Sequence, residues 1–242
     1  MNKKFIIFLL LIFISGFAFS QIIEKPYDYP IKRGTSEWFS IKTYDSLRIV
    51  SQIPFDIIEK MSTNVLVQSI INYPLLGDVF VFESYQKGLE KLNYNFTAID
   101  ALLQRSDLDS NLLATYTKYL DKNIDSFSVI KKGEYSVQIS FIELLIQYCF
   151  QQNKIAISKN QLYLRQLLRS YYKKKISSDI FGAMSLSTCV WSMNGILLAD
   201  KASEKFATQE VFIIKGNTFS DSVVARLATQ AETFLKQTTS AN

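Results

Sequence analysis

Residues 53–82, IPFDIIEKMSTNVLVQSIINYPLLGDVFVF, predict two short helices and an apolar run that pack on one another. Pro54 suits the first turn of a helix, where its missing N–H costs nothing. The second helix carries apolar residues at i, i+4 and i+7, the spacing of one helix face: Leu66, Ile70 and Tyr73. Pro74 disfavours helical backbone at the preceding residue and so ends that helix. Because none of these elements can bury its apolar face alone, we expect the stretch to nucleate the core.

Short motifs in and before this stretch resemble those of a protein family. They are Arg33-Gly34-Thr35-Ser36-Glu37-Trp38, Met61-Ser62-Thr63 and Asn72-Tyr73-Pro74-Leu75-Leu76. Their order, RGTxEW, KMST and NYPLL, resembles an uncharacterised family of secreted bacterial all-helical proteins, and the resemblance extends over residues 33–105. It implies a secreted all-helical bacterial protein. It implies no catalytic residue, since the family's motifs carry no known activity.

Helical periodicity continues beyond this stretch, so the sequence predicts an all-α, irregular multi-helix bundle in one domain, residues 43–237. Ser62, Thr63 and Asn64 offer side-chain oxygens that can cap the second helix, and Thr43 is expected to cap an earlier one. Residues 121–133, DKNIDSFSVIKKG, are polar and lack helical period, which makes them a candidate subdomain boundary before a helix at 134–152. The segment from Val211 to Ile214 is β-branched and aromatic and predicts one short strand. Residues 238–242 are expected to form a flexible tail.

Residues 21–42 predict an extended N-terminal arm on the surface of the helical domain. Pro26 and Pro30 break helices. Two interpretations remain open for the tyrosines of this segment and Trp38. The rings either staple the arm to its own core or stand exposed as anchors for a partner, since such rings are common at interfaces.

The first twenty residues have the pattern of a signal peptide. Lys3 and Lys4 form a basic region, an apolar run follows, and Ala18 and Ser20 occupy the positions that a signal peptidase reads. We expect cleavage between Ser20 and Gln21 and a secreted or periplasmic mature chain. The rival interpretation is an uncleaved anchor, for which the apolar run is short. Residues 181–198 come closest to a later membrane span, but serines and polar residues dilute them, and no later span is predicted.

Composition excludes several chemistries. The chain has no histidine, two cysteines and eight glycines. These counts remove Ser-His-Asp and Cys-His catalysis, a four-thiolate zinc site and a glycine-rich phosphate loop, so no cofactor and no metal are predicted. The formal net charge is +5, and 5 − 2 = +3 without the two leader lysines, which does not favour a nucleic-acid partner.

Two groups of residues are candidate sites. A basic stripe on the helix that ends near residue 174 offers a surface for an anionic partner or lipid, or is a solvated face: Arg165, Arg169, Lys173, Lys174 and Lys175. Cys149 and Cys189 lie in apolar helical patterns, where they either pair as a disulfide or stay free as small buried hydrophobes. Gly195, in the predicted helix 177–199, marks a position of close helix approach, as does Gly182.

The leading functional hypothesis is a non-catalytic binding or interaction module of the cell envelope, including inhibitor or immunity-type roles, whose partner is another protein or an envelope component. The alternative is a hydrolase that acts on cell-wall or carbohydrate material through a pair of carboxylates. The two differ in what the largest cleft holds, since the hydrolase requires two acidic side chains within it.

Overall fold

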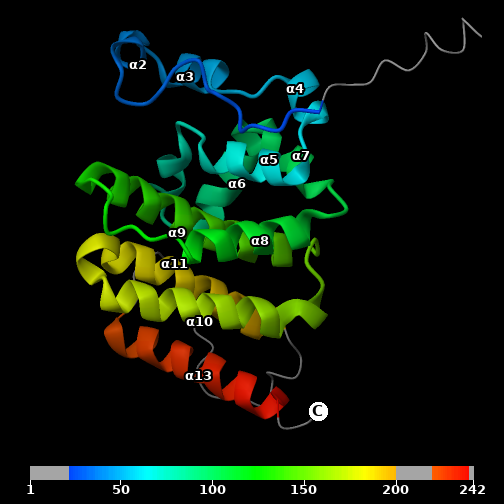
Figure 1. Ribbon diagram of the computed structural model, residues 1–242, viewed down its shortest axis with the longest axis vertical. Coiled ribbons are helices and arrows are strands. Elements are labelled where there is room, and N and C mark those ends of the chain that lie inside the picture. The colour runs from blue at the N-terminus through cyan, green and yellow to red at the C-terminus, as the bar shows by residue number, and fades with distance from the viewer. Residues whose placement is uncertain (1–21, 200–219, 240–242) are drawn as a thin grey trace, which may run out of the picture.

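The computed structural model describes residues 22–199 and 220–239, and within these ranges the chain is all-α (Figure 1). The elements are α2 (Ser36–Ser40), α3 (Tyr44–Val50), α4 (Phe55–Lys60), α5 (Thr63–Ile71), the 3-10 helix η1 (Leu76–Phe80), α6 (Tyr85–Asn95), α7 (Thr97–Leu103), α8 (Leu108–Leu120), α9 (Val129–Gln151), η2 (Ile157–Lys159), α10 (Asn160–Ile176), α11 (Ser178–Ala199) and α13 (Asp221–Thr239). The predicted fold class is confirmed.

The helices are stacked in layers that follow the order of the chain (Figure 1). The N-terminal segment with α2, α3 and α4 lies at one end. Helices α5, α6 and α7 come next, followed by α8 with α9, then α10 with α11, and finally α13. Buried apolar residues from all these layers join one core cluster, which continues on both sides of residues 121–133. Helix α9 lies near its middle, since it packs against α11 on one side and against α5, α6 and α8 on the other.

The stretch 53–82 folds largely as its pattern predicts. Helix α4 begins directly after Pro54, and the side chain of Ser62 caps α5 by accepting a hydrogen bond from the backbone N–H of Val65 at 3.4 Å. Leu66 and Ile70 are fully buried. The helix stops before Pro74, and the apolar run that follows is wound into η1. The nucleus of the core therefore contains the predicted residues.

Three details differ from the predictions. The arm is not extended throughout, because Thr35 caps the short helix α2 by accepting a hydrogen bond from Trp38 N–H. The long helix starts at Val129 rather than near residue 134, because Ser128 caps it and residues 129–134 form an exposed start to the helix. The strand predicted at 211–214 and the tail 240–242 lie outside the described residues.

Hydrogen bonds attach the arm to the helical body. Ile23 N–H donates to the carbonyl of Lys60 at 2.9 Å, which forms an isolated parallel bridge between Ile23 and Met61. Farther along, Ser69 of α5 receives two contacts: Tyr27 N–H donates to its hydroxyl at 2.9 Å, and the Tyr29 hydroxyl donates to its carbonyl at 2.9 Å. These tyrosines therefore staple the arm to its own core, which is one of the two interpretations offered above.

Helix α11 combines an apolar composition with buried polar contacts. It is long and apolar enough to cross a membrane by length and composition, contrary to the expectation from its serines, and 61% of its most apolar window is buried in the fold. A Cβ added to Gly195 would lie 1.9 Å from Gln147 Nε2 of α9, so the predicted close approach is confirmed there. Gly182 instead has φ +62° with no atom near its Cβ position, and it bends the helix.

Candidate binding cleft

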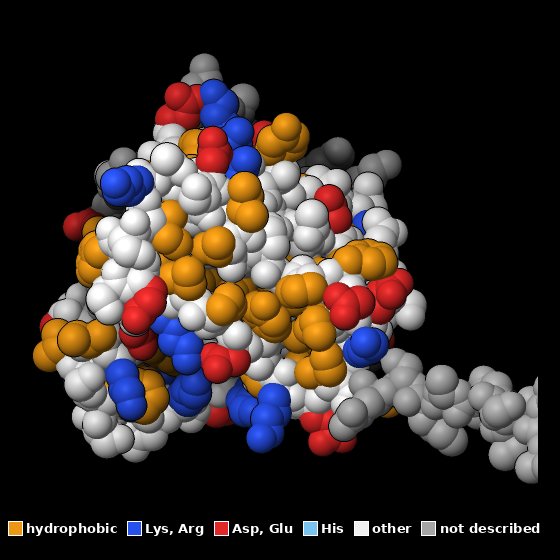
Figure 2. Space-filling view, turned by 90° about the horizontal axis from the view of Figure 1, so that it is seen from above, with side chains coloured by type: hydrophobic (Ala, Val, Ile, Leu, Met, Phe, Trp, Pro, Cys, Tyr) orange, Lys and Arg blue, Asp and Glu red, His pale blue; other side chains and the backbone are white. Residues whose placement is uncertain are grey.

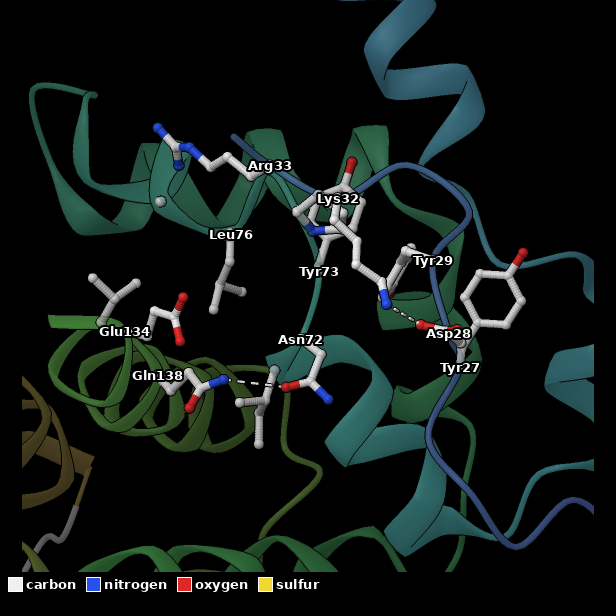
Figure 3. Close-up of a pocket in the computed structure, with 14 residues that line it drawn as sticks. Tyr27, Asp28, Tyr29, Lys32, Arg33, Asn72, Tyr73, Leu76, Glu134 and Gln138 are labelled. Atoms are coloured by element: carbon white, nitrogen blue, oxygen red, sulfur yellow. Dashed lines mark hydrogen bonds and ion pairs between the residues drawn. The ribbon is translucent and has the colours of Figure 1, made fainter. Parts of the chain in front are cut away.

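A cleft of about 530 Å³ opens between the N-terminal arm, the end of α5 and the first turns of α9 (Figure 3). Three parts of the chain line it: Tyr27, Asp28, Tyr29, Lys32 and Arg33 of the arm; Ile71, Asn72, Tyr73, Pro74, Leu76 and Gly77 at and after the end of α5; and Glu134, Val137 and Gln138 of α9. The volume lies within the range of small-molecule sites. The floor of the cleft therefore comes from the stretch that organises the core, and its opposite walls come from elements distant in sequence.

The floor is rigid because aromatic rings and a helix end hold it. Asn72 ends α5 as its C-cap residue, and its backbone N–H donates to Gln68 O at 3.1 Å. The ring of Tyr73 stacks on Phe96 with centroids 3.9 Å apart, and Tyr29 lies edge-on to it at 6.0 Å. Burial raises the pKa of both tyrosines, so their hydroxyls stay protonated. The cleft keeps its shape because these rings belong to the core.

Some polar groups that line the cleft are paired and others are not. Lys32 forms an exposed ion pair with Asp28 at 2.8 Å, and Gln138 Nε2 donates to Asn72 Oδ1 at 3.1 Å. Arg33 and Glu134 make no side-chain hydrogen bond or ion pair with any described residue. Figure 3 shows them on the same side of the cleft, with the guanidinium above and the carboxylate below. The cleft thus presents a cation, an anion and one pair of amides to a ligand.

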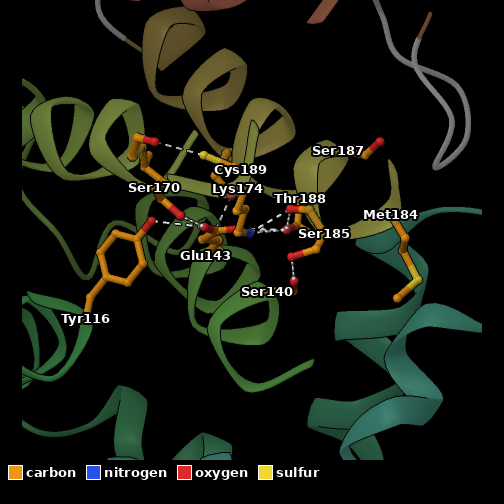
Figure 4. Close-up of polar contacts among 12 residues, drawn as sticks. Tyr116, Ser140, Glu143, Ser170, Lys174, Met184, Ser185, Ser187, Thr188 and Cys189 are labelled. Atoms are coloured by element: carbon orange, nitrogen blue, oxygen red, sulfur yellow. Dashed lines mark hydrogen bonds and ion pairs between the residues drawn. The ribbon is translucent and has the colours of Figure 1, made fainter. Parts of the chain in front are cut away.

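The strongest internal charge cluster lies elsewhere, between α8, α9, α10 and α11 (Figure 4). Glu143 of α9 and Lys174 of α10 form an ion pair at 2.6 Å, and both side chains are 0% exposed. Three hydroxyl groups donate to the same carboxylate: Tyr116 at 3.0 Å, Ser170 at 2.6 Å and Thr188 at 2.6 Å. Lys174 Nζ also donates to the carbonyl of Ser185 at 2.6 Å. Each charge is therefore neutralised and hydrogen-bonded inside the bundle.

This cluster has the residue types of an active site but no access for a substrate. Burial, followed by the charge of Glu143, raises the pKa of the Tyr116 hydroxyl and of the Cys189 thiol. Neither group is activated as a nucleophile or base, since both are held in their neutral forms. Two signals in the sequence mark the pair: Glu143 interrupts the apolar run of α9, and Lys174 falls on the inner face of α10, seven residues after Leu167. The sequence interpretation missed both signals.

The predicted basic stripe is not one continuous surface. The prediction that Lys174 lies on the surface is wrong. Position 174 lies about 100° round the helix from Lys173, so its side chain faces the core. Arg169 pairs with Asp121 across to α8. Lys173 Nζ donates to the carbonyls of Leu120 at 2.8 Å and Lys122 at 3.1 Å, and Lys175 lies over the ring of Tyr171. Arg165 is exposed, and it too is engaged in a contact, as the other members of the stripe are.

The remaining predicted residues are placed as follows. Trp38 of α2 is half-buried and packs on the edge of the core cluster. Cys149 and Cys189 are free thiols in the structure, and both are buried. The Cys189 thiol donates to the carbonyl of Leu167 at 2.9 Å, so it is directed at α10. The two cysteines are therefore free and act as small buried hydrophobes, which is the alternative to the disulfide interpretation.

The end of the molecule formed by the arm, α2, α3 and α4 also carries exposed apolar side chains. Phe39, Ile49 and Phe55 are each more than 60% exposed. Seen from this end, hydrophobic side chains gather across the surface among charges of both signs (Figure 2). Exposed apolar surface of this kind is a common feature of protein interfaces.

No three histidine, cysteine, aspartate or glutamate side chains within residues 22–199 and 220–239 are grouped so that they could hold a metal ion. Comparison with known proteins adds no assignment: no protein-family model, no curated protein and no solved structure matches this chain.

Proposed function

We propose that the mature chain is a non-catalytic binding module of the bacterial cell envelope, and that the cleft beneath the N-terminal arm is its ligand site. The observation that supports this proposal most is the content of the cleft. It has a rigid aromatic floor, and it offers Arg33 and Glu134 without partners among the described residues. Groups that are unpaired and convergent in a preformed cleft are typical of sites that bind polar ligands.

Within residues 22–199 and 220–239, the groups that could react are buried or engaged, which favours binding over catalysis. The Glu143–Lys174 cluster is sealed in the bundle, and the Ser170 hydroxyl beside it is committed to Glu143. In the cleft, the carboxylate of Asp28 is engaged by Lys32. An envelope location is proposed from the leader, in which Lys3 and Lys4 precede an apolar run and Ser20 ends a cleavage motif.

Inhibitor or immunity-type roles remain within the same proposal. The apolar side chains at the arm end of the molecule, with Phe39 and Phe55 among them, suit a protein partner. In such a role the cleft would receive a projecting segment of that partner.

The proposal is tested by filling the cleft. Val137 lines it from α9, and Val137→Trp should reduce retention of the mature protein on envelope fractions of the source bacterium at least tenfold. Ile130→Trp is the matched control, because Ile130 lies on the same helix, is 76% exposed and does not line the cleft. Circular dichroism melting checks that both variants fold. Equal retention of Val137→Trp and the control would contradict the proposal.

The hydrolase alternative is supported by one observation, the presence of two acidic side chains, Asp28 and Glu134, in the cleft. It predicts that purified mature chain degrades isolated cell-wall material and that the double variant Asp28→Asn/Glu134→Gln does not. The binding proposal predicts no release of soluble fragments by either protein, measured by reducing-sugar and free-amine assays. Degradation by the wild type that the double variant loses would establish the alternative.

A further inference from the structure

We infer that the cleft receives the carboxylate end of a short peptide, with Arg33 binding the carboxylate and the Asn72–Gln138 amide pair binding the backbone N–H and C=O of a neighbouring residue. This inference rests on the proposed function and names the ligand class of the same site. It follows from the hydrogen-bonding groups that the cleft leaves open and from the balance of its charges.

Arg33 is an exposed side chain that lines the cleft and leaves its guanidinium open to a ligand. Its Nη1 atom lies 3.0 Å from where a Cβ of residue 77 would stand, so the guanidinium lies against Gly77, which has no side chain there. Elsewhere in the chain, Arg48 binds Asn95 and Arg105 binds the carbonyl of Ile58. Arg33 makes no such bond to any residue that the structure describes. A guanidinium presents paired N–H groups that match both oxygens of a carboxylate.

The two side-chain amides offer the complement of the backbone N–H and C=O of one extended residue. Gln138 Nε2 donates to Asn72 Oδ1, and this bond leaves Asn72 Nδ2 as a donor and Gln138 Oε1 as an acceptor. Neither atom has another hydrogen bond to the described residues. If the oxygen and nitrogen of both amides exchange places, the pair still leaves one donor and one acceptor, Gln138 Nε2 and Asn72 Oδ1. In an extended peptide the N–H and the C=O of one residue point to the same side of the chain, so one residue of the ligand can satisfy both amides at once.

The charge balance of the cleft selects against multiply charged anions. Lys32 and Arg33 contribute two positive charges, and Asp28 and Glu134 contribute two negative charges. A phosphate group at Arg33 would bring almost two negative charges into a lining that already holds the carboxylates of Asp28 and Glu134, whereas a peptide carboxylate brings one. A peptide with a free amine and a free carboxylate has no net charge and allows both Arg33 and Glu134 to find opposite charges.

Apolar surface accounts for the remaining space. Leu76 and Val137 line the cleft beside the two tyrosines of the arm, Tyr27 and Tyr29. These groups can cover small or aliphatic side chains of a peptide, and they add no further charge. The combination of one cation, one amide pair and an apolar lining fits a peptide terminus better than a sugar, which has no carboxylate in its unmodified form.

The experiment is isothermal titration of the full mature chain with tri-alanine, with tri-alanine amide and with inorganic phosphate. We expect tri-alanine to bind and its amide to bind roughly ten- to hundredfold more weakly, which is the effect of losing one charged hydrogen-bonded contact. Arg33→Gln should weaken tri-alanine binding by the same factor, whereas Lys25→Gln, the same charge change at an exposed residue outside the cleft, should leave it within twofold. Arg33→Lys, which keeps the charge without the fork, should fall between the two.

The inference is overturned if the acid and the amide bind equally, if Arg33→Gln binds like Lys25→Gln, or if phosphate binds more tightly than tri-alanine. It is also overturned if no peptide binds while Val137→Trp still reduces retention on envelope fractions. In that last case the proposed function stands and only the ligand class is wrong. If Val137→Trp leaves retention unchanged, the proposed function itself is contradicted.

Discussion

Replacing Lys174 by methionine tests how the buried charge cluster stabilises the bundle. The substitution keeps a chain of similar length on the inner face of α10 but removes the ammonium that lies 2.6 Å from Glu143 Oε2. The carboxylate then remains 0% exposed without an opposite charge. An unpaired charge at such a depth strongly destabilises a fold, because no water can replace the lost partner.

The magnitude follows from what Glu143 keeps. Breaking one partner from a buried ion pair costs about 3–5 kcal/mol of the free energy of unfolding. Three hydroxyl groups still donate to the carboxylate in the variant, those of Tyr116, Ser170 and Thr188. We therefore expect Lys174→Met to lower the free energy of unfolding by about 3 kcal/mol, the lower end of that range. The double variant Glu143→Gln/Lys174→Met should recover ~1–2 kcal/mol of the loss, since it removes the unpaired charge and keeps an acceptor for two hydroxyl groups.

The assay is urea unfolding of the mature chain, followed by far-ultraviolet circular dichroism at neutral pH and analysed as a double-mutant cycle. Lys175→Met is the control, because Lys175 is the next residue on α10 and is exposed over the ring of Tyr171. It should change the free energy of unfolding by less than ~1 kcal/mol. A loss below ~1 kcal/mol for Lys174→Met, or a double variant no more stable than that single one, would refute the reasoning.

Three further predictions concern packing, the thiols and the arm. Gly88→Ala should destabilise the fold by about 1–3 kcal/mol, because the new Cβ would lie 2.1 Å from the carbonyl oxygen of Val79. Gly133→Ala in α9, where no atom lies within 4 Å of the new Cβ, should instead stabilise the fold by up to ~1 kcal/mol. Urea unfolding measures both changes. Burial raises the pKa of the Cys149 thiol to about 12 from its ordinary value of 9.0. The protonated thiol therefore contributes its full share of stability below pH 9, and this share is lost as the pH rises towards 12, which melting temperatures across that range measure. Native protein at neutral pH should not react with a thiol reagent that modifies the urea-unfolded chain. Ser69→Ala removes the hydroxyl that accepts a hydrogen bond from the backbone N–H of Tyr27 at 2.9 Å. Proteolysis should therefore cut the arm faster, and tri-alanine should bind more weakly. An unchanged cleavage rate would show that the other contacts are enough to hold the arm.

Local pattern predicted most of the helices that the structure describes. Apolar residues at helical spacing, such as Leu66 and Ile70, predicted which faces are buried, because the period of a helix is set by the backbone of the segment itself. Pro74 predicted where α5 ends, and the three candidate caps at residues 62–64, of which Ser62 is the observed one, predicted where it begins, for the same reason. The start of α9 at Val129 was missed, since the first turn is exposed and its two apolar residues, Val129 and Ile130, are adjacent and do not repeat at helical spacing.

The candidate site depended on contacts between segments distant in the chain. Arg33, Asn72 and Gln138 meet in the cleft although dozens of residues separate them, and no spacing in the sequence records that meeting. The sequence alone determined an all-α chain with a leader-like start, because composition and periodicity are properties of neighbouring residues. Only the tertiary structure decided that Lys174 faces Glu143 inside the bundle and that Arg33 faces an open cleft, because the partner of a charged side chain depends on which helices are packed together.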